Sequence, residues 1–283
     1  MKIVALLTVR NEELYIERCI NHLNSQGVEV YLIDNGSTDD TVNIAKKYLG
    51  KGMIAIENIP YNGRFEWLQI LRNKERLASE IEADWLIHYD ADEIREAPPP
   101  YMTLREGIME ADKQGYNAIN FDEFVFIPTK EDGSFEGRDY LKEMKYYYFF
   151  EQRPMTQIKA WKKSAKPVSL ATSGGHRVDF EGRNIFPVNF IMRHYIALSI
   201  RHLIEKYSTR VYSEKEVKER GWHKDRAGFD PLKIALPKKE QLKEISDKGV
   251  WDRSDPWNKH KFLGFSYPKR PKPGKIKPKI SVI

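Results

Sequence analysis

The sequence contains a single cysteine, Cys19, among its 283 residues. One cysteine cannot form a disulfide within the chain, so the fold must be held together by its core rather than by cross-links. A reducing compartment is consistent with this, and we expect a cytoplasmic protein. Hydrophobic residues make up 41% of the chain and charged residues 31%, which is typical of a globular domain of this length with a sizeable core.

Long apolar runs are also missing. The apolar stretch near the start of the sequence ends at Arg10, which is too short for a signal peptide or a membrane span. We therefore interpret residues 2–8 as a first buried strand. The glycine-rich patterns that bind nucleotides in dehydrogenases and P-loop ATPases do not follow this strand, which disfavours both classes.

Acidic residues are absent from residues 266–283, which carry six lysines and arginines and four prolines. This segment alone accounts for the net charge of +6, and its composition predicts an extended, irregular tail. Such a tail is either a solvated end without further role or a weak electrostatic contact for an anionic membrane surface or an acidic glycan, so a position at the inner face of the membrane is an alternative to a fully cytoplasmic one. No motif that reads bases accompanies it, and we expect no nucleic-acid partner.

Strands and amphipathic helices alternate in the first hundred residues. Residues 28–33, 53–56 and 85–89 are the next predicted strands, and helices with buried stripes lie between them. This order predicts an α/β fold with a mostly parallel central sheet flanked by helices. Because the pattern weakens from about residue 221, we divide the chain into a domain of residues 1–225 and a C-terminal helical or irregular extension, residues 226–283.

The strand at residues 85–89 ends in three carboxylates, Asp90, Asp92 and Glu93. In an open α/β sheet, ligands bind just beyond the carboxyl ends of the strands. Alternation places Asp90 and Asp92 on the same side, and two like charges this close are stabilised by a cation between them. Hard oxygen ligands of this kind suit Mg²⁺ or Mn²⁺.

Four motifs occur in a characteristic order. They are Thr-Val-Arg-Asn-Glu-Glu (8–13), Leu-Ile-Asp-Asn-Gly-Ser-Thr-Asp-Asp-Thr (32–41), Leu-Arg-Asn (71–73) and Asp-Ala-Asp-Glu (90–93). Together they resemble the family 2 glycosyltransferases, which have the Rossmann-like GT-A fold. The resemblance is strong up to about residue 95 and looser over residues 170–215. It implies a UDP- or GDP-sugar donor, a DXD motif and a divalent metal, Mn²⁺ or Mg²⁺.

The resemblance also implies roles for individual residues. Asp34 would accept the N–H of a uracil-like base, or else only cap the turn that follows it. Arg72 would reach the diphosphate, or else form an ion pair on its helix. The predicted nucleotide-sugar-binding residues are Thr8, Arg10, Glu12, Asp34, Arg72, Asp90, Gly175 and His176. The predicted metal ligands are Asp90, Asp92 and His194, with His176 as the competing histidine.

Family 2 enzymes invert the anomeric carbon, which requires a general base for the acceptor hydroxyl. The family's usual Glu-Asp pair after the glycine turn is missing here. Asp122, Glu123 and Asp179 are the candidates, and Glu123 is preferred. The Q-x-x-R-W motif of processive synthases is also missing, which favours single sugar addition over polymer extrusion.

The predicted function is therefore metal-dependent, inverting transfer of a sugar to a glycan or glycolipid acceptor, such as lipopolysaccharide or capsule. Two alternatives stay open. A sugar nucleotidyltransferase is disfavoured because its glycine-rich loop after the first strand is missing. A catalytically degenerate domain that binds a nucleotide or glycan is disfavoured by the intact Asp90 and Asp92.

Overall fold

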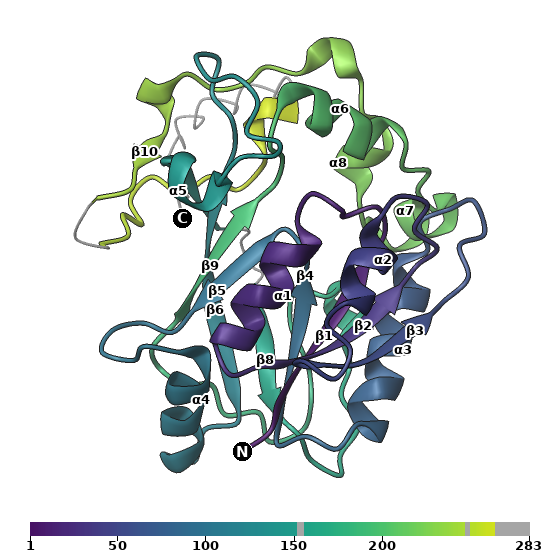
Figure 1. Cartoon of the computed structure of the whole chain (residues 1–283), viewed down its shortest axis with the longest axis vertical. Helices are drawn as coiled ribbons and strands as arrows, with labels where there is room; N and C mark the ends of the chain where they lie inside the picture. Colours follow the sequence, from purple (N-terminus) through teal and green to yellow (C-terminus); the bar gives the residue numbers. More distant parts are fainter. Residues whose placement is uncertain (152–155, 247–249, 264–283) are drawn as a thin grey trace, which may run out of the picture.

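The computed structural model describes residues 1–151, 156–246 and 250–263 (Figure 1). Its strands are β1 (Ile3–Val9), β2 (Glu29–Asp34), β3 (Met53–Asn58), β4 (Trp85–Asp90), β5 (Glu93–Glu96), β6 (Ala118–Phe126), β7 (Tyr146–Phe150), β8 (Ile158–Lys162), β9 (Phe190–Tyr195) and β10 (Lys243–Glu244). Its helices are α1 (Ile16–Ser25), α2 (Thr41–Lys46), α3 (Trp67–Glu80), α4 (Leu104–Lys113), α5 (Tyr140–Glu143), α6 (Ile200–Ser208), α7 (Glu214–Arg220) and α8 (Lys224–Ala227).

One twisted sheet runs through the molecule. Strands β3, β2, β1 and β4 lie side by side in that order and are parallel, as the alternation of strands and helices predicted. Strand β8 pairs antiparallel with β4 and β6, and β7 continues the sheet beyond β6. The carboxyl ends of β1, β2 and β4 therefore meet at one edge, where α/β proteins bind ligands.

Helices cover both faces of the parallel strands. Helices α1, α2 and α4 pack on one face, where α1 buries Ile16, Cys19, Ile20 and Leu23 at helical spacing. Helix α3 packs on the other face through Ile70, Leu71, Leu77 and Ala78. The core is thus two apolar layers separated by the sheet, and the α/β architecture predicted from the sequence is confirmed.

The C-terminal extension folds back onto the sheet. Phe262 and Leu263 share a small apolar core with Tyr148 of β7 and Tyr207 of α6. The ring of Trp257 stacks on that of Tyr148 with centroids 4.2 Å apart. The proposed boundary at residue 225 stays a prediction, and the basic tail, residues 266–283, lies outside the described residues.

Strand β5 directly follows the acid cluster, and the sequence analysis predicted neither β5 nor β9. Strand β9 pairs with β5 antiparallel and with β6 parallel, and this places Glu93 opposite His194 in register. Residues far apart in the sequence are thereby fixed beside the DXD motif. Among the described helices, none has the length and apolar character needed to cross a membrane.

Candidate active site

A cavity of about 510 Å³ opens at the carboxyl ends of the parallel strands. Most of the predicted site residues line it, namely Thr8, Arg10, Glu12, Asp90, Asp92, Glu123, Gly175, His176 and His194. Four of the predicted residues do not, namely Asp34, Arg72, Asp122 and Asp179. The fold therefore brings together the DXD motif, the β1 loop and the late histidines.

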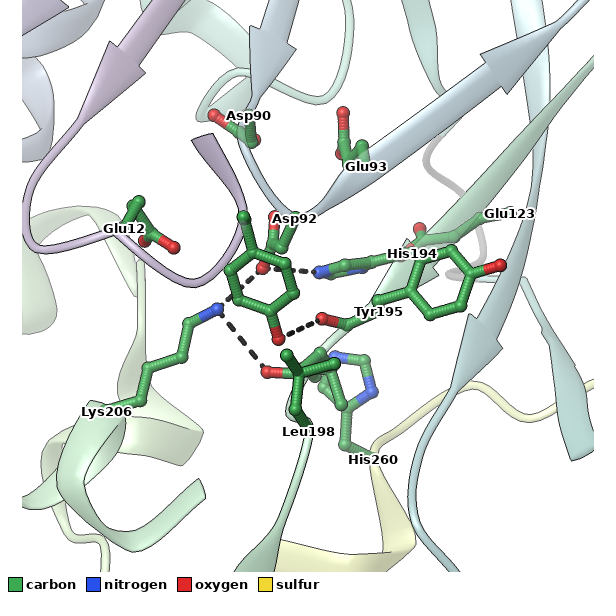
Figure 2. Close-up of polar contacts among 12 residues, drawn as sticks. Glu12, Asp90, Asp92, Glu93, Glu123, His194, Tyr195, Leu198, Lys206 and His260 are labelled. Atoms are coloured by element: carbon green, nitrogen blue, oxygen red, sulfur yellow. Dashed lines mark hydrogen bonds and ion pairs between the residues drawn. The ribbon is translucent and has the colours of Figure 1, made fainter. Parts of the chain in front are cut away.

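A chain of polar contacts runs through the middle of the cavity (Figure 2). The Oδ2 atom of Asp92 lies 3.2 Å from Nε2 of His194 and 2.6 Å from Nζ of Lys206. On the far side of the imidazole, Nδ1 of His194 lies 2.7 Å from Oε1 of Glu123. The other oxygen of Glu123 accepts a hydrogen bond from Gln157 at 2.7 Å. Each of these side chains is mostly buried, so their mutual positions are well defined.

Charges in this chain stabilise one another. Burial would raise the pKa of Asp92, but Lys206 and His194 hold it well below its usual range. Burial would lower the pKa of His194, yet Asp92 and Glu123 hold it well above its usual range. The carboxylate of Asp92 is therefore ionised between two cations, and a metal bound here would have to replace the proton on Nε2 of His194, because only a neutral imidazole can be a ligand.

The donor atoms here suit a divalent ion that the substrate helps to bind. Asp92 offers a carboxylate oxygen next to a ring nitrogen of His194, and Glu123 behind the ring is the usual partner of a metal-binding imidazole. No group of three or more histidines, cysteines or acids among the described residues could hold a metal alone. Mg²⁺ in phosphate chemistry is commonly held by one or two carboxylates plus the substrate's phosphates, so two protein ligands are enough.

Asp90 and Glu93 face three further cations. Nζ of the fully buried Lys74 and Nζ of Lys159 each lie 3.9 Å from a carboxylate oxygen of Asp90. Lys159 also pairs with Glu93 at 2.9 Å, and Arg95 holds the other oxygen of Glu93. Asp90 is one-third exposed to the cavity, whereas Glu93 is almost wholly enclosed. Asp90 is thus the more accessible of the two.

Three buried oxygens at the ends of β1 and β2 make no hydrogen bond to the described residues. They are Oγ1 of Thr8, Oε2 of Glu12 and Oδ1 of Asn35, and all three residues line the cavity. The other oxygen of Glu12 lies 3.3 Å from Arg210, and burial raises the pKa of Glu12 to about 7 despite the opposing charge of Lys206. Unsatisfied buried oxygens are costly, so a ligand with N–H or O–H groups fits this end of the cavity.

Asp34 has the turn-capping role rather than a place in the cavity. Its carboxylate accepts the backbone N–H groups of Gly36 and Ser37 at 3.1 Å. Arg10 also stabilises this turn, because it donates to the carbonyl of Gly36 while its guanidinium stacks 3.4 Å above the ring of Tyr61. The structure therefore places Asn35, and not Asp34, at the cavity wall.

Three other predicted residues lie in ion pairs away from the cavity. Arg72 is 64% exposed and pairs with Glu75 one turn further along α3. Asp122 pairs with Arg253 and accepts a hydrogen bond from Asn189, and Asp179 is held by Arg177 and Arg183. These contacts occupy their charged groups, so among the candidate bases only Glu123 borders the cavity.

The glycine turn serves close packing. Gly174 and Gly175 have left-handed backbone angles, φ +66° and +87°. A Cβ on Gly174 would lie 2.7 Å from the indole of Trp222, and one on Gly175 would lie 3.0 Å from Trp67. The turn was predicted to approach a donor sugar, but the nearest neighbours of both glycines are aromatic side chains.

Sequence reasoning missed several cations and three histidines at the site. The residues that contact the acids or line the cavity are Lys74, Lys159, Lys206, Arg210, Arg226, His88, His223 and His260. The only local pattern in the sequence near any of them is the helical periodicity around Lys206. They come from different parts of the sequence, so no single motif contains them. Tertiary structure alone identifies them.

Comparison with known proteins gives one family. Residues 5–119 match the family model described as glycosyl transferase family 2. An uncharacterised glycosyltransferase of Rickettsia prowazekii is 28% identical over 225 residues, which cover 77% of this chain and 68% of that protein. The lipopolysaccharide core biosynthesis glycosyltransferase LpsC of Rhizobium meliloti is 27% identical over 111 residues, 37% of this chain and 38% of that protein.

Solved structures resemble the chain more distantly. TarS of S. aureus, in complex with UDP, aligns with a TM-score of 0.45 at 12% identity, covering 83% of this chain and 76% of that one. Glucosyl-3-phosphoglycerate synthase from Mycobacterium tuberculosis, in complex with Mn²⁺, UDP and glucosyl-3-phosphoglycerate, aligns with a TM-score of 0.30 at 21% identity. That alignment covers 44% of each chain.

Proposed function

We propose that this chain transfers a sugar from a UDP- or GDP-sugar to a hydroxyl of a glycan or glycolipid. The basis is that the chain belongs to glycosyl transferase family 2 and is a glycosyltransferase with the GT-A fold. In this proposal the reaction inverts the anomeric carbon and requires Mn²⁺ or Mg²⁺. The acceptor belongs to lipopolysaccharide or another surface polysaccharide, which the likeness to LpsC supports. The reaction takes place in the cytoplasm or at the inner face of the membrane.

The observation that carries this proposal is the meeting of Asp92 and His194. They are 102 positions apart in the sequence, lie 3.2 Å apart in space, and Glu123 supports the imidazole from behind. An ordinary structural ion pair needs no such carboxylate–imidazole–carboxylate chain at the floor of a cavity. Metal sites use this arrangement to orient a histidine ligand.

The chain's own residues divide the work along the cavity. Thr8, Glu12 and Asn35 supply the unsatisfied oxygens that would bind the hydroxyl and N–H groups of the nucleoside. Lys159 and Lys206 place positive charge beside the DXD motif, where the diphosphate would lie. A divalent ion bound by Asp92 and His194, with Asp90 beside it, would supply the positive charge that stabilises the leaving nucleotide.

Two carboxylates are candidates for the general base. Glu123 remains the predicted base, although His194 and Gln157 hold both of its oxygens. Glu12 is the second candidate, because its Oε2 is unpaired among the described residues and its pKa of about 7 suits proton transfer at neutral pH. Glu123 also supports His194, and Glu12 also lies at the nucleoside end, so a base variant is identified by lost turnover at saturating nucleotide sugar, beyond any change in nucleotide affinity. Glu123→Gln and Glu12→Gln are therefore compared by both measurements.

The deciding experiment is calorimetric titration of UDP and then GDP, with and without Mn²⁺, into the native protein and Asp92→Ala. We expect one nucleotide to bind, the affinity to depend on Mn²⁺, and the metal dependence to vanish in Asp92→Ala. Binding that ignores both the metal and Asp92 would contradict the proposed metal site. Failure of both nucleotides to bind would contradict the proposed donor.

Turnover separates the remaining alternatives. Release of UDP or GDP from a nucleotide sugar, in the presence of an acceptor extract, is expected from a transferase. A degenerate domain would bind the nucleotide without releasing it from the sugar. A sugar nucleotidyltransferase would instead release pyrophosphate from a nucleoside triphosphate and a sugar phosphate.

A further inference from the structure

One wall of the cavity is built by α8 and the C-terminal extension. Trp222, His223, Arg226, Lys259 and His260 all line it. The guanidinium of Arg226 lies 3.5 Å from Nε2 of His260 and 5.4 Å from the centre of the Tyr207 ring. The imidazole of His260 and the ring of Tyr207 are both uncharged, so neither neutralises the charge of Arg226 at the cavity.

The other cations near the DXD motif have carboxylate partners. Lys206 pairs with Asp92, Arg210 with Glu12 and Lys159 with Glu93. Arg226 forms no ion pair with any carboxylate in the described part of the chain, and this includes the exposed Asp225 beside it in sequence. A guanidinium that is largely removed from water is costly unless an anion compensates it. Arg226 is therefore a half-buried cation at this wall that makes no direct ion pair within the described residues, although Asp92 and Glu123 act on it from a distance.

The histidines around Arg226 are neutral and held in place. Nδ1 of His260 lies 2.6 Å from the hydroxyl of Tyr148, which leaves Nε2 facing Arg226. Burial, with the charge of Arg226, lowers the pKa of His223 to about 3 and that of His260 well below its usual range. Arginine can only donate, so Nε2 of His260 accepts from Arg226 and its N–H lies at Nδ1 towards Tyr148, whereas the neutral His223 can donate one N–H to an anion. This wall thus combines one permanent cation with adaptable hydrogen-bonding groups.

We propose that Arg226, positioned by His260, binds an oxyanion on the acceptor, either a phosphate or a carboxylate. This rests on the proposed function, because it assigns this wall to the acceptor of the transfer. The unsatisfied oxygens for the donor nucleoside lie at the ends of β1 and β2, and Lys159 and Lys206 lie at the DXD motif. Arg226 instead lies among residues of α8 and the extension. The acceptor is therefore an acidic or phosphorylated glycan rather than a neutral one.

The test uses the protein saturated with Mg²⁺ and whichever nucleoside diphosphate binds, so that the donor's phosphate positions are filled. Inorganic phosphate, and separately acetate, are titrated into the native protein, Arg226→Gln, Arg226→Lys and Arg220→Gln. Arg220 on α7 is the matched control, because it is exposed, stacks on Trp222 and does not line the cavity. Thermal melting of each variant verifies that it is folded.

We expect at least one of the two anions to bind. Its affinity should fall about tenfold or more in Arg226→Gln, as for the loss of a hydrogen bond to a charged group. Arg226→Lys should retain part of the affinity, Arg220→Gln all of it, and nucleotide affinity should change less than twofold in every variant. The anion that binds more tightly identifies the acidic group.

Two results would overturn the inference. If Arg226→Gln weakens the nucleotide as much as the anion, Arg226 serves the donor's diphosphate. If neither anion binds, or if binding is the same in Arg226→Gln, the wall has no anion site. Should neither nucleotide bind at all, the proposed function fails separately, and titration of phosphate into the nucleotide-free protein still decides the role of Arg226.

Discussion

The two sides of the cavity are built in different ways. On one side, Thr8, Glu12, Asn35 and Asp90 each stand within a few residues of the end of a parallel strand. On the other side, the histidines, lysines and arginines come from β8, β9, α6, α8, loops and the C-terminal extension. The first side is rich in oxygen atoms, and the second in nitrogen atoms. Under the proposed function, the strand ends would bind the donor and the later elements would bind the acceptor.

The largest expected effect is at the junction of the two sides. His194→Ala should lower Mn²⁺-dependent nucleotide affinity about 100-fold and Glu123→Gln about tenfold, because the ligand and its orienting carboxylate both act through the metal. Calorimetry with and without Mn²⁺ measures both values, and metal-free affinity is the control. Equal Mn²⁺ dependence in His194→Ala and the native protein would make this histidine a structural residue.

The glycine turn tests whether the second side depends on packing. Gly174→Ala should lower the free energy of unfolding by about 1–3 kcal/mol, because alanine disfavours positive φ and its Cβ would clash with Trp222. Gly182→Ala is the matched control, with φ +76° and no atom within 4 Å of a Cβ. Urea unfolding should show the smaller loss there. Equal losses in the two variants would mean that Trp222 moves aside freely.

Asp179 should affect stability and not chemistry. Burial raises the pKa of Asp179, but hydrogen bonds from Arg177, Thr172 and Arg183 outweigh it and lower this pKa to about 2. Because this pKa is below the ordinary value of 3.8, the ionised group stabilises the fold above about pH 4, and the contribution is lost as the pH falls towards 2. Asp179→Asn should thus cost about 1 kcal/mol at pH 7 and nothing near pH 2.

Unfolding at both pH values measures this difference. Nucleotide affinity and turnover at pH 7 should be unchanged in Asp179→Asn. Loss of turnover at unchanged stability would restore Asp179 as a candidate general base.

The smallest effect is expected at Arg72. Its guanidinium is 64% exposed and its ion pair with Glu75 lies on the surface of α3. Arg72→Ala should change the free energy of unfolding by no more than about 0.5 kcal/mol and leave nucleotide affinity unchanged. A clear loss of affinity in calorimetry would show that α3 moves Arg72 towards the diphosphate when the donor binds.

The donor side could be predicted from the sequence because its chemistry is local. Asp90 and Asp92 were found because they follow a buried apolar run, although the chain turns at residues 91–92 and does not continue the extended alternation that was expected. Asp34 shows the limit of such reasoning. Its motif predicted a contact with the nucleotide base, but its carboxylate caps its own turn. The neighbouring Asn35, and not Asp34, lines the cavity.

The acceptor side could not be predicted in the same way. His194 was chosen as the late histidine of the family because it follows the apolar residues 190–192. Strand β9 itself was not predicted, because its apolar run is short. Lys206 reaches Asp92 across 114 positions of sequence, and His260 reaches Tyr148 across 112. Contacts of this kind depend on how elements pack, and no local pattern of residues encodes them.

The pairing of β5 with β9 limits how this enzyme can change its length during evolution. Glu93 and His194 are register partners, so the distance from the DXD motif to the imidazole is set by a hydrogen-bonded ladder. Adding or deleting one residue between Phe190 and His194 would turn the imidazole to the opposite face of the strand. We therefore expect related sequences to carry insertions and deletions in the loop before Phe190 but not within β9. Changes of length in that loop would leave the register between Glu93 and His194 unchanged.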